Sequence, residues 1–246
     1  DKYLSEVIEF CLGKQVVLPK VLGPRDVAAE VRSDIAKDVL IGPGMGDNAG
    51  AAKGLELTPG GFAVSIGTSG TIFGSLTKQS SDPSGAIAGF ADADGNFLPL
   101  VCTLNAARVL EWGAALLGTS LDEFGELALH AEPGAGGVKV IPYLEGERTP
   151  NLPNATAEVL GITLKNGGRE NFARACIEGM LNGLAFGARA ITEQGHQIRS
   201  IQLIGGAAAN RAVQQIAAEV FAVPVTVPAP GEYVALGAAK QAAGLE

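Results

Sequence analysis

The stretch SIQLIGGAAANRAVQQIAAEVFAVPVTV, residues 200–227, decides the fold class. Apolar residues alternate over 200–204 and two glycines follow. Residues 210–221 then place apolar positions at helical spacing, ahead of a second β-prone run at 223–227. This change of period predicts a strand, a turn, a helix and a strand. With a further helix expected over 234–243, the alternation predicts an α/β domain whose helices cover a sheet.

The preceding chain predicts more of the same sheet and its helices. Residues 62–66 and 71–76 predict a hairpin around 67–70, and residues 86–90 and 96–101 predict a second one around DADG. Helices are expected over 105–117, 121–129 and 170–194, with a strand over 138–144. The last helix carries Gly179, Gly183 and Gly187 at four-residue spacing. Each glycine weakens a helix by about 0.5–1 kcal/mol, so the spacing predicts a closely packed neighbour.

Composition excludes several functional classes. The chain has 246 residues, 47% of them hydrophobic, so it can bury a sizeable core. A formal charge of -8 offers no electrostatic footprint for nucleic acid or an anionic membrane. No apolar run approaches the ~20 residues of a membrane span, and no signal peptide is visible. The three cysteines are widely spaced and form no CxxC pair, so we expect a cytoplasmic protein without a disulfide framework or a metal site.

The chain begins at Asp1, directly in a helical pattern, and we therefore expect it to be a piece of a longer protein. Farther on, the run DVLI, residues 38–41, predicts a short buried strand. It leads into the glycine-rich loop GPGMGDNAG, residues 42–50.

Three glycine-rich loops that leave β-prone runs are the candidate functional features. Such loops expose backbone N–H groups and admit phosphate oxygens. The loop GTSGT, residues 67–71, adds three hydroxyls to its N–H groups, although a plain hairpin turn explains the pattern equally well. IGGAAAN, residues 204–210, places Asn210 near a helix start, where a helix cap is favoured over a ligand contact. Neither GxGxxG nor GxxxxGK[ST] occurs.

The third loop, GMGDN, presents Asp47 beyond the run at 38–41. A carboxylate there could cap a helix that begins at Ala49. It could equally act as a general base for an attacking hydroxyl, a role worth about 10²–10⁴ in rate. The sequence leaves both open.

Taken in order, GMGDNAG, SIGTSGT, YLEGERTP, LIGGAAANRAVQQIAAEVFAVPV and ALGAA resemble the C-terminal half of FGGY carbohydrate kinases. The resemblance runs through nearly the whole chain. It implies a ribonuclease-H-like (actin-like ATPase) domain with a mixed sheet flanked by helices. Residues 1–246 would then be the C-terminal nucleotide-binding domain, and the N-terminal sugar-binding domain, with its early DxGT/S loop, is absent from this chain.

The same resemblance implies roles for particular residues. Asp47 matches the catalytic base, and the nucleotide would be bound by Gly67, Thr68, Ser69, Ala107, Gly205, Gly206, Ala207 and Asn210. The substrates would be a sugar and ATP with Mg²⁺, and a homodimer would be one assembly known in the family. A non-catalytic nucleotide binder is the alternative, and the isolated chain, with half a site, is expected to be inactive.

YLEGERTP, residues 143–150, resembles the xylulokinase branch of the family, and with small changes gluconokinases, more than glycerol kinases. This implies D-xylulose as the sugar, with gluconate, ribulose and glycerol as alternatives. Within the motif, we expect Glu147 and Arg148 to pair and fix the loop's shape rather than to contact substrate.

Overall fold

A six-stranded mixed sheet forms the centre of the computed structural model, which describes residues 3–32, 36 and 38–245. The strands are β3 (Gly61–Ile66), β4 (Gly70–Gly74), β5 (Ala88–Ala91), β6 (Phe97–Thr103), β9 (Ser200–Ile204) and β10 (Val225–Thr226), in the order β10-β9-β3-β4-β6-β5. β9 runs parallel to both β3 and β10, whereas the β3–β4, β4–β6 and β6–β5 pairs are antiparallel. The predicted α/β class and both predicted hairpins are confirmed.

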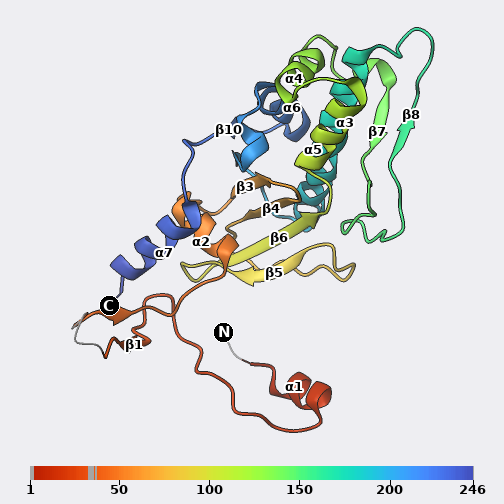
Figure 1. Cartoon of the computed structure of the whole chain (residues 1–246). Helices are drawn as coiled ribbons and strands as arrows, with labels where there is room; N and C mark the ends of the chain where they lie inside the picture. Colours follow the sequence, from red (N-terminus) through yellow and green to blue (C-terminus); the bar gives the residue numbers. More distant parts are fainter. Residues whose placement is uncertain (1–2, 33–35, 37, 246) are drawn as a thin grey trace.

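Helices cover both faces of this sheet (Figure 1). One face carries α3 (Ala107–Leu117), α4 (Leu121–Leu129), α5 (Arg169–Glu193) and α6 (Arg211–Phe221), and the other carries α2 (Asp47–Gly54) and α7 (Tyr233–Ala243). Strand β3 shows why two layers are needed. Phe62 and Val64 are buried beneath α3 to α6, while Ala63, between them, is buried beneath α2, because successive strand residues face opposite sides.

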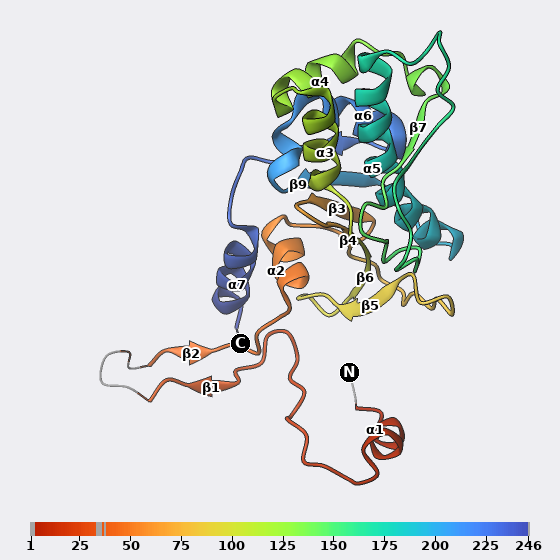
Figure 2. The same cartoon turned by 45° about the vertical axis from the view of Figure 1, so that its right-hand side comes forward.

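The glycines of α5 lie where the helix meets its neighbours. A Cβ on Gly179 would fall 2.3 Å from the carbonyl oxygen of Val140 in β7 (Lys139–Ile141), and one on Gly187 would fall 2.8 Å from the Cβ of Val101. The predicted close packing is confirmed at Gly179 and Gly187, whereas a Cβ on Gly183 would meet only the Thr103 Cγ2 atom, at 3.9 Å. For Gly179 the neighbour is not the central sheet, since β7 pairs with β8 (Glu158–Leu160) in a separate ribbon beside α5 (Figure 2). Short 3-10 helices lie before β7, at Ala135–Gly137, and after β9, at Gly206–Ala209.

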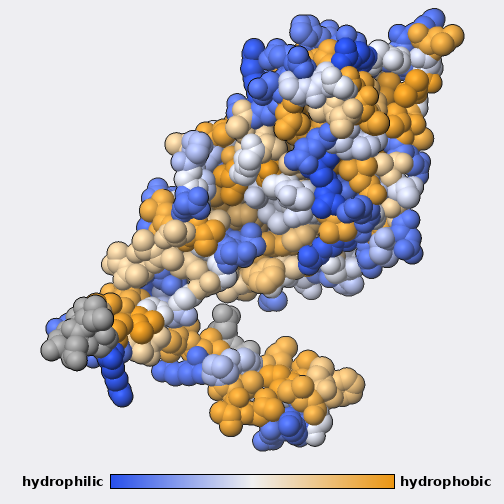
Figure 3. All heavy atoms as spheres, in the orientation of Figure 1, coloured by the Kyte–Doolittle hydropathy of each residue, from blue (hydrophilic) through white to orange (hydrophobic). Residues whose placement is uncertain are grey.

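The elements α1, β1 and β2 lie apart from the central sheet (Figure 2), and here one prediction is wrong. The run at 38–41 contributes only β2 (Leu40–Ile41), which pairs with β1 (Ala29–Glu30), and both residues of β2 are 45% exposed. A short apolar run predicts a strand but not what covers it. The helix α1 (Ser5–Leu12) buries no residue either, and hydrophobic side chains gather on its surface (Figure 3).

Candidate nucleotide and phosphoryl-transfer site

Two of the three candidate loops meet at one edge of the sheet. The parallel strands β3 and β9 are in register from Gly61 opposite Ser200 to Ser65 opposite Ile204, so their carboxyl ends lie side by side. Gly205, directly after β9, has φ +91°, and a Cβ there would fall 2.7 Å from the carbonyl oxygen of Ile66. Only glycine fits, because a side chain would collide with the backbone from which the 67–70 loop emerges.

The loop at 67–70 has its carbonyls engaged and its tip free. The carbonyl oxygen of Gly67 accepts from the Ala107 amide at 2.8 Å, and that of Thr68 accepts from the Ala106 amide at 3.2 Å. Thr68 and Ser69 are exposed, and within the described part of the chain no hydrogen bond engages their amides or hydroxyls. Such converging neutral donors fit phosphate oxygens. The loop is thus braced from behind by the start of α3.

Ala107 and Asn210 take part in this architecture through bonds within the protein. Ala107 is the first residue of α3, and its amide is the donor that holds Gly67. Asn210 caps α6, since its Oδ1 accepts from the amides of Ala212 at 2.9 Å and Val213 at 3.3 Å. The cap interpretation of Asn210 is confirmed. Gly206 is different, because no atom lies within 4 Å of a Cβ built there, which leaves open space beside the turn.

Asp47 is the first residue of α2, so the helix begins two residues earlier than predicted and Gly46, not Asp47, is the N-cap. Its Oδ1 accepts from the Asn48 amide at 2.7 Å and from the Asn48 side chain at 3.1 Å. The side chain is exposed, and its Oδ2 has no hydrogen bond within residues 3–32, 36 and 38–245. Asp47 therefore satisfies one first-turn amide and still has an oxygen that can accept a proton.

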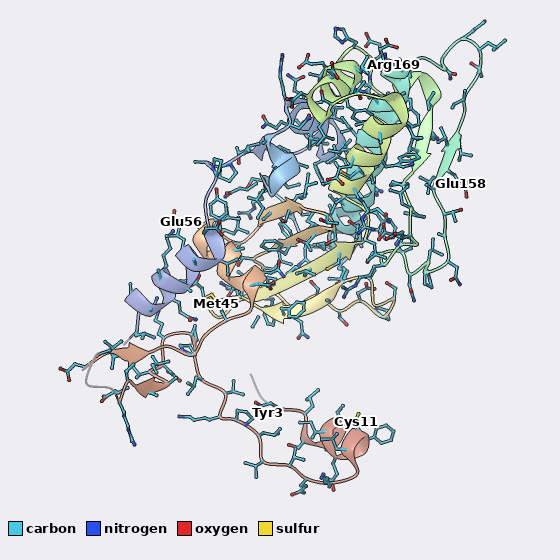
Figure 4. The ribbon with its side chains drawn as sticks, viewed as in Figure 1. Tyr3, Cys11, Met45, Glu56, Glu158 and Arg169 are labelled. Carbon is cyan, nitrogen blue, oxygen red and sulfur yellow. The ribbon has the colours of Figure 1, made fainter. Side chains whose placement is uncertain are left out.

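Asp47 begins the helix that covers Cys102, a residue near the base of the 67–70 loop. Cys102 pairs with Thr71, one step from the Gly70–Thr103 pair at the base of the loop, and it packs on the side that α2 covers. Partial burial raises the pKa of the Cys102 thiol, the positive charge of Arg148 lowers it, and the negative charge of Asp47 raises it. Both charges thus lie near this thiol. In Figure 4, Met45 marks the segment that leads into α2, and this segment lies beside β5 and β6.

Glu147 is a buried carboxylate whose partners the sequence did not reveal. Its side chain, in a residue only 3% exposed, accepts from the amides of Leu104 at 2.5 Å and Arg148 at 2.7 Å and from Asn105 Nδ2 at 3.0 Å. The expected ion pair with Arg148 is not formed. The prediction that Glu147 fixes the loop's shape is right. The predicted partner was wrong, because the motif itself cannot locate Leu104 and Asn105, which are more than forty positions away along the chain.

The described part of the chain carries neither a cluster of metal ligands nor a membrane-spanning helix. Among those residues, no group of three or more His, Cys, Asp and Glu side chains is arranged to hold a metal ion. None of the helices the structure describes is both long enough and apolar enough to cross a membrane.

The sequence model of the FGGY family of carbohydrate kinases, C-terminal domain, matches residues 62–244. A xylulose kinase of Streptomyces rubiginosus is 40% identical over 100% of this chain and 50% of its own length, and one of Streptomyces coelicolor is 37% identical over the same shares. The crystal structure of a xylulose kinase from Bifidobacterium adolescentis has a TM-score of 0.88 and 46% identity, covering 94% of this chain and 47% of that one.

The chain spans about half the length of the curated relatives it matches. The structural likeness confirms the predicted ribonuclease-H-like, actin-like fold with a mixed sheet between helices. Asp47 precedes the residues matched by the family model but lies within the alignment to the full-chain relatives. On these matches, the chain belongs to the FGGY family of carbohydrate kinases.

Proposed function

We propose that the whole protein containing this chain transfers the γ-phosphoryl group of ATP to D-xylulose and forms D-xylulose 5-phosphate. The observation that carries the proposal is the placement of Asp47, with a free carboxylate oxygen, at the sheet edge where the amides and hydroxyls of Thr68 and Ser69 are also free. Relatives named xylulose kinase support the choice of sugar. ATP is the phosphate donor of the family's sugar kinases.

In the proposed reaction, Asp47 and the loop at 67–69 have different tasks. Asp47 accepts the proton of the sugar's terminal hydroxyl as that oxygen bonds to the γ-phosphorus, and the bond from phosphorus to the bridging oxygen of ADP breaks. The loop at 67–69 orients the phosphate oxygens, and the Gly205 turn lies beside it, where the open space at Gly206 can admit the nucleoside. Mg²⁺ would arrive with ATP, bound to its phosphate oxygens and reducing their charge.

We further propose that residues 1–246 form the nucleotide-binding half and that the rest of the whole protein binds the sugar. Closure of the two halves would exclude water and limit hydrolysis of ATP. The isolated chain would then turn over no sugar. We place the enzyme in the cytoplasm, as a homodimer that binds no nucleic acid, and gel filtration of the whole protein tests the dimer.

The test is ADP release by the whole protein with D-xylulose, L-ribulose, gluconate or glycerol. Turnover that depends on D-xylulose is the expected result. Turnover with another of these would keep the kinase and change the sugar, whereas no sugar-dependent turnover would favour a nucleotide-binding protein.

Asp47→Asn tests the base. We expect it to lower sugar phosphorylation by about 10²–10⁴ and to leave ATP binding intact, because it removes the proton acceptor only. Asp122→Asn is the matched control, since Asp122 also lies exposed in the first turn of a helix, α4. Equal activity of the two variants would refute the role of Asp47.

A further inference from the structure

Arg148 carries a charge that the fold leaves without a partner. Its side chain is exposed, and within the described part of the chain it makes no hydrogen bond or ion pair. Two other cations of this domain are engaged: Lys53 of α2 pairs with Asp94 at 2.5 Å, and Arg108 of α3 pairs with Glu145 at 2.7 Å. An arginine without a partner beside a cluster of neutral donors can bind an anion.

The backbone of Arg148 is nonetheless firmly placed. Its amide donates to Glu147 Oε1, the same oxygen that accepts from the Leu104 amide, and Asn105 Nδ2 bridges the other carboxylate oxygen and the Gly146 carbonyl. Glu147 and Asn105 are 3% and 2% exposed, so water competes little for these bonds. The loop that contains Arg148 is therefore tied to the backbone that follows β6.

The same short segment also holds the 67–70 loop. The amides of Ala106 and Ala107, directly after Asn105, donate to the carbonyls of Thr68 and Gly67. Residues 104–107 thus bind the Arg148 loop through Leu104 and Asn105 and the phosphate-accepting loop through the next two residues. The two loops are held in a defined relation to each other by one four-residue segment.

The Arg148 loop lies at the end of β6 nearest Cys102, because Leu104 and Asn105, which bind the loop, directly follow that strand. The positive charge of Arg148 acts on the Cys102 thiol together with the negative charge of Asp47, and Cys102 lies on the face covered by α2. The guanidinium group and the carboxylate of Asp47 thus both act on one residue of this sheet edge, two positions before the segment that holds the 67–70 loop. This sheet edge is where a transferring phosphoryl group would pass between nucleotide and hydroxyl.

We propose that Arg148 binds the terminal phosphoryl group of the nucleotide, and that the buried Glu147 and Asn105 position it there. The inference rests on the proposed function. Guanidinium is permanently charged, and its fork of N–H donors matches two phosphoryl oxygens at once. It supplies a positive charge to a site whose loop donors, the amides and hydroxyls of Thr68 and Ser69, are all neutral. Arg148 would then stabilise the charge that develops on the phosphoryl oxygens during transfer.

The experiment compares Arg148→Gln and Arg148→Lys in the whole protein, with Arg189→Gln as a matched control on the exposed side of α5. We expect Arg148→Gln to lower kcat by about 10²–10³, the effect of removing one transition-state donor, and Arg148→Lys to fall between it and the unmodified protein. The control should be unchanged, and all four proteins should unfold at the same temperature.

Calorimetric binding of adenylyl imidodiphosphate and of ADP separates a phosphoryl contact from a structural role. A contact to the terminal phosphoryl group predicts that Arg148→Gln binds the triphosphate analogue about 10–100-fold more weakly and binds ADP unchanged. Equal weakening of both nucleotides, or no weakening of either, would overturn the proposal. The binding result stands even if the unmodified protein phosphorylates none of the sugars, an outcome that would refute the proposed function alone.

Discussion

Replacing Gly179 with alanine tests how closely α5 packs against β7. The added Cβ would lie 2.3 Å from the carbonyl oxygen of Val140, more than 1 Å inside the 3.4 Å at which ordinary van der Waals contact begins. The obstacle is backbone, which no side-chain rotation can move aside. Gly183, one helical turn later, is the matched control, because its Cβ would meet only the Thr103 Cγ2 atom at 3.9 Å.

The two substitutions should change stability in opposite directions. Alanine stabilises a helix interior by about 0.5–1 kcal/mol relative to glycine, and Gly183→Ala should gain this amount in full. At Gly179 the same gain is outweighed by overpacking, which typically costs about 1–3 kcal/mol, so a net loss of roughly 0.5–2 kcal/mol is expected. At about 2–4 °C per kcal/mol, Gly179→Ala should lower Tm by roughly 1–8 °C and Gly183→Ala should raise it by roughly 1–4 °C.

Thermal unfolding of the whole protein, followed by circular dichroism with and without ADP, measures both shifts. A rise in Tm for both variants would refute the close contact between α5 and β7. A fall for both would show that helix propensity does not govern Gly183.

Two further predictions concern the turn after β9 and a buried thiol. Gly205→Ala should lower stability by about 1–3 kcal/mol and weaken ADP binding, because φ is +91° and the Ile66 carbonyl oxygen is 2.7 Å from the new Cβ. Gly206→Ala is the control and should leave Tm unchanged, since no atom lies within 4 Å of its Cβ. Equal Tm values for the two variants would contradict this prediction. Burial raises the pKa of the Cys176 thiol from 9.0 to about 12, so the folded state keeps its proton where the unfolded state loses it. The resulting stability is complete below about pH 9 and is lost as the pH rises toward 12, and urea unfolding across this range should show a loss that is absent in Cys176→Ala.

The periodic patterns of the chain sufficed for its regular elements. Residues 200–227 predicted β9, α6 and β10 because strand and helix expose different periods, and the glycine spacing of α5 predicted a close neighbour. The same reasoning could not identify that neighbour as β7. It also placed the run at 38–41 in a core, although Leu40 and Ile41 pair only with a second exposed strand. Hydrophobicity is local, whereas burial depends on what the rest of the fold brings near.

The candidate site, too, could be predicted from the sequence only in part. The three loops were visible in the sequence because glycines and hydroxyls after a β-prone run have a chemical meaning of their own. The convergence of two of them, those after β3 and β9, was not visible, since it depends on the parallel pairing of these strands across more than a hundred residues. The bracing of Gly67 by Ala107 and the capping of α6 by Asn210 likewise required coordinates.

By itself, the sequence determined the α/β class, the three candidate loops and, through its motifs, the kinase family. Only the tertiary structure decided which charges share a site. It kept Glu147 and Arg148 from pairing, buried the first among hydrogen-bond donors and left the second exposed. The physical reason is that a carboxylate removed from water takes whichever donors the fold supplies, and those at residues 104 and 105 lie more than forty positions away along the chain.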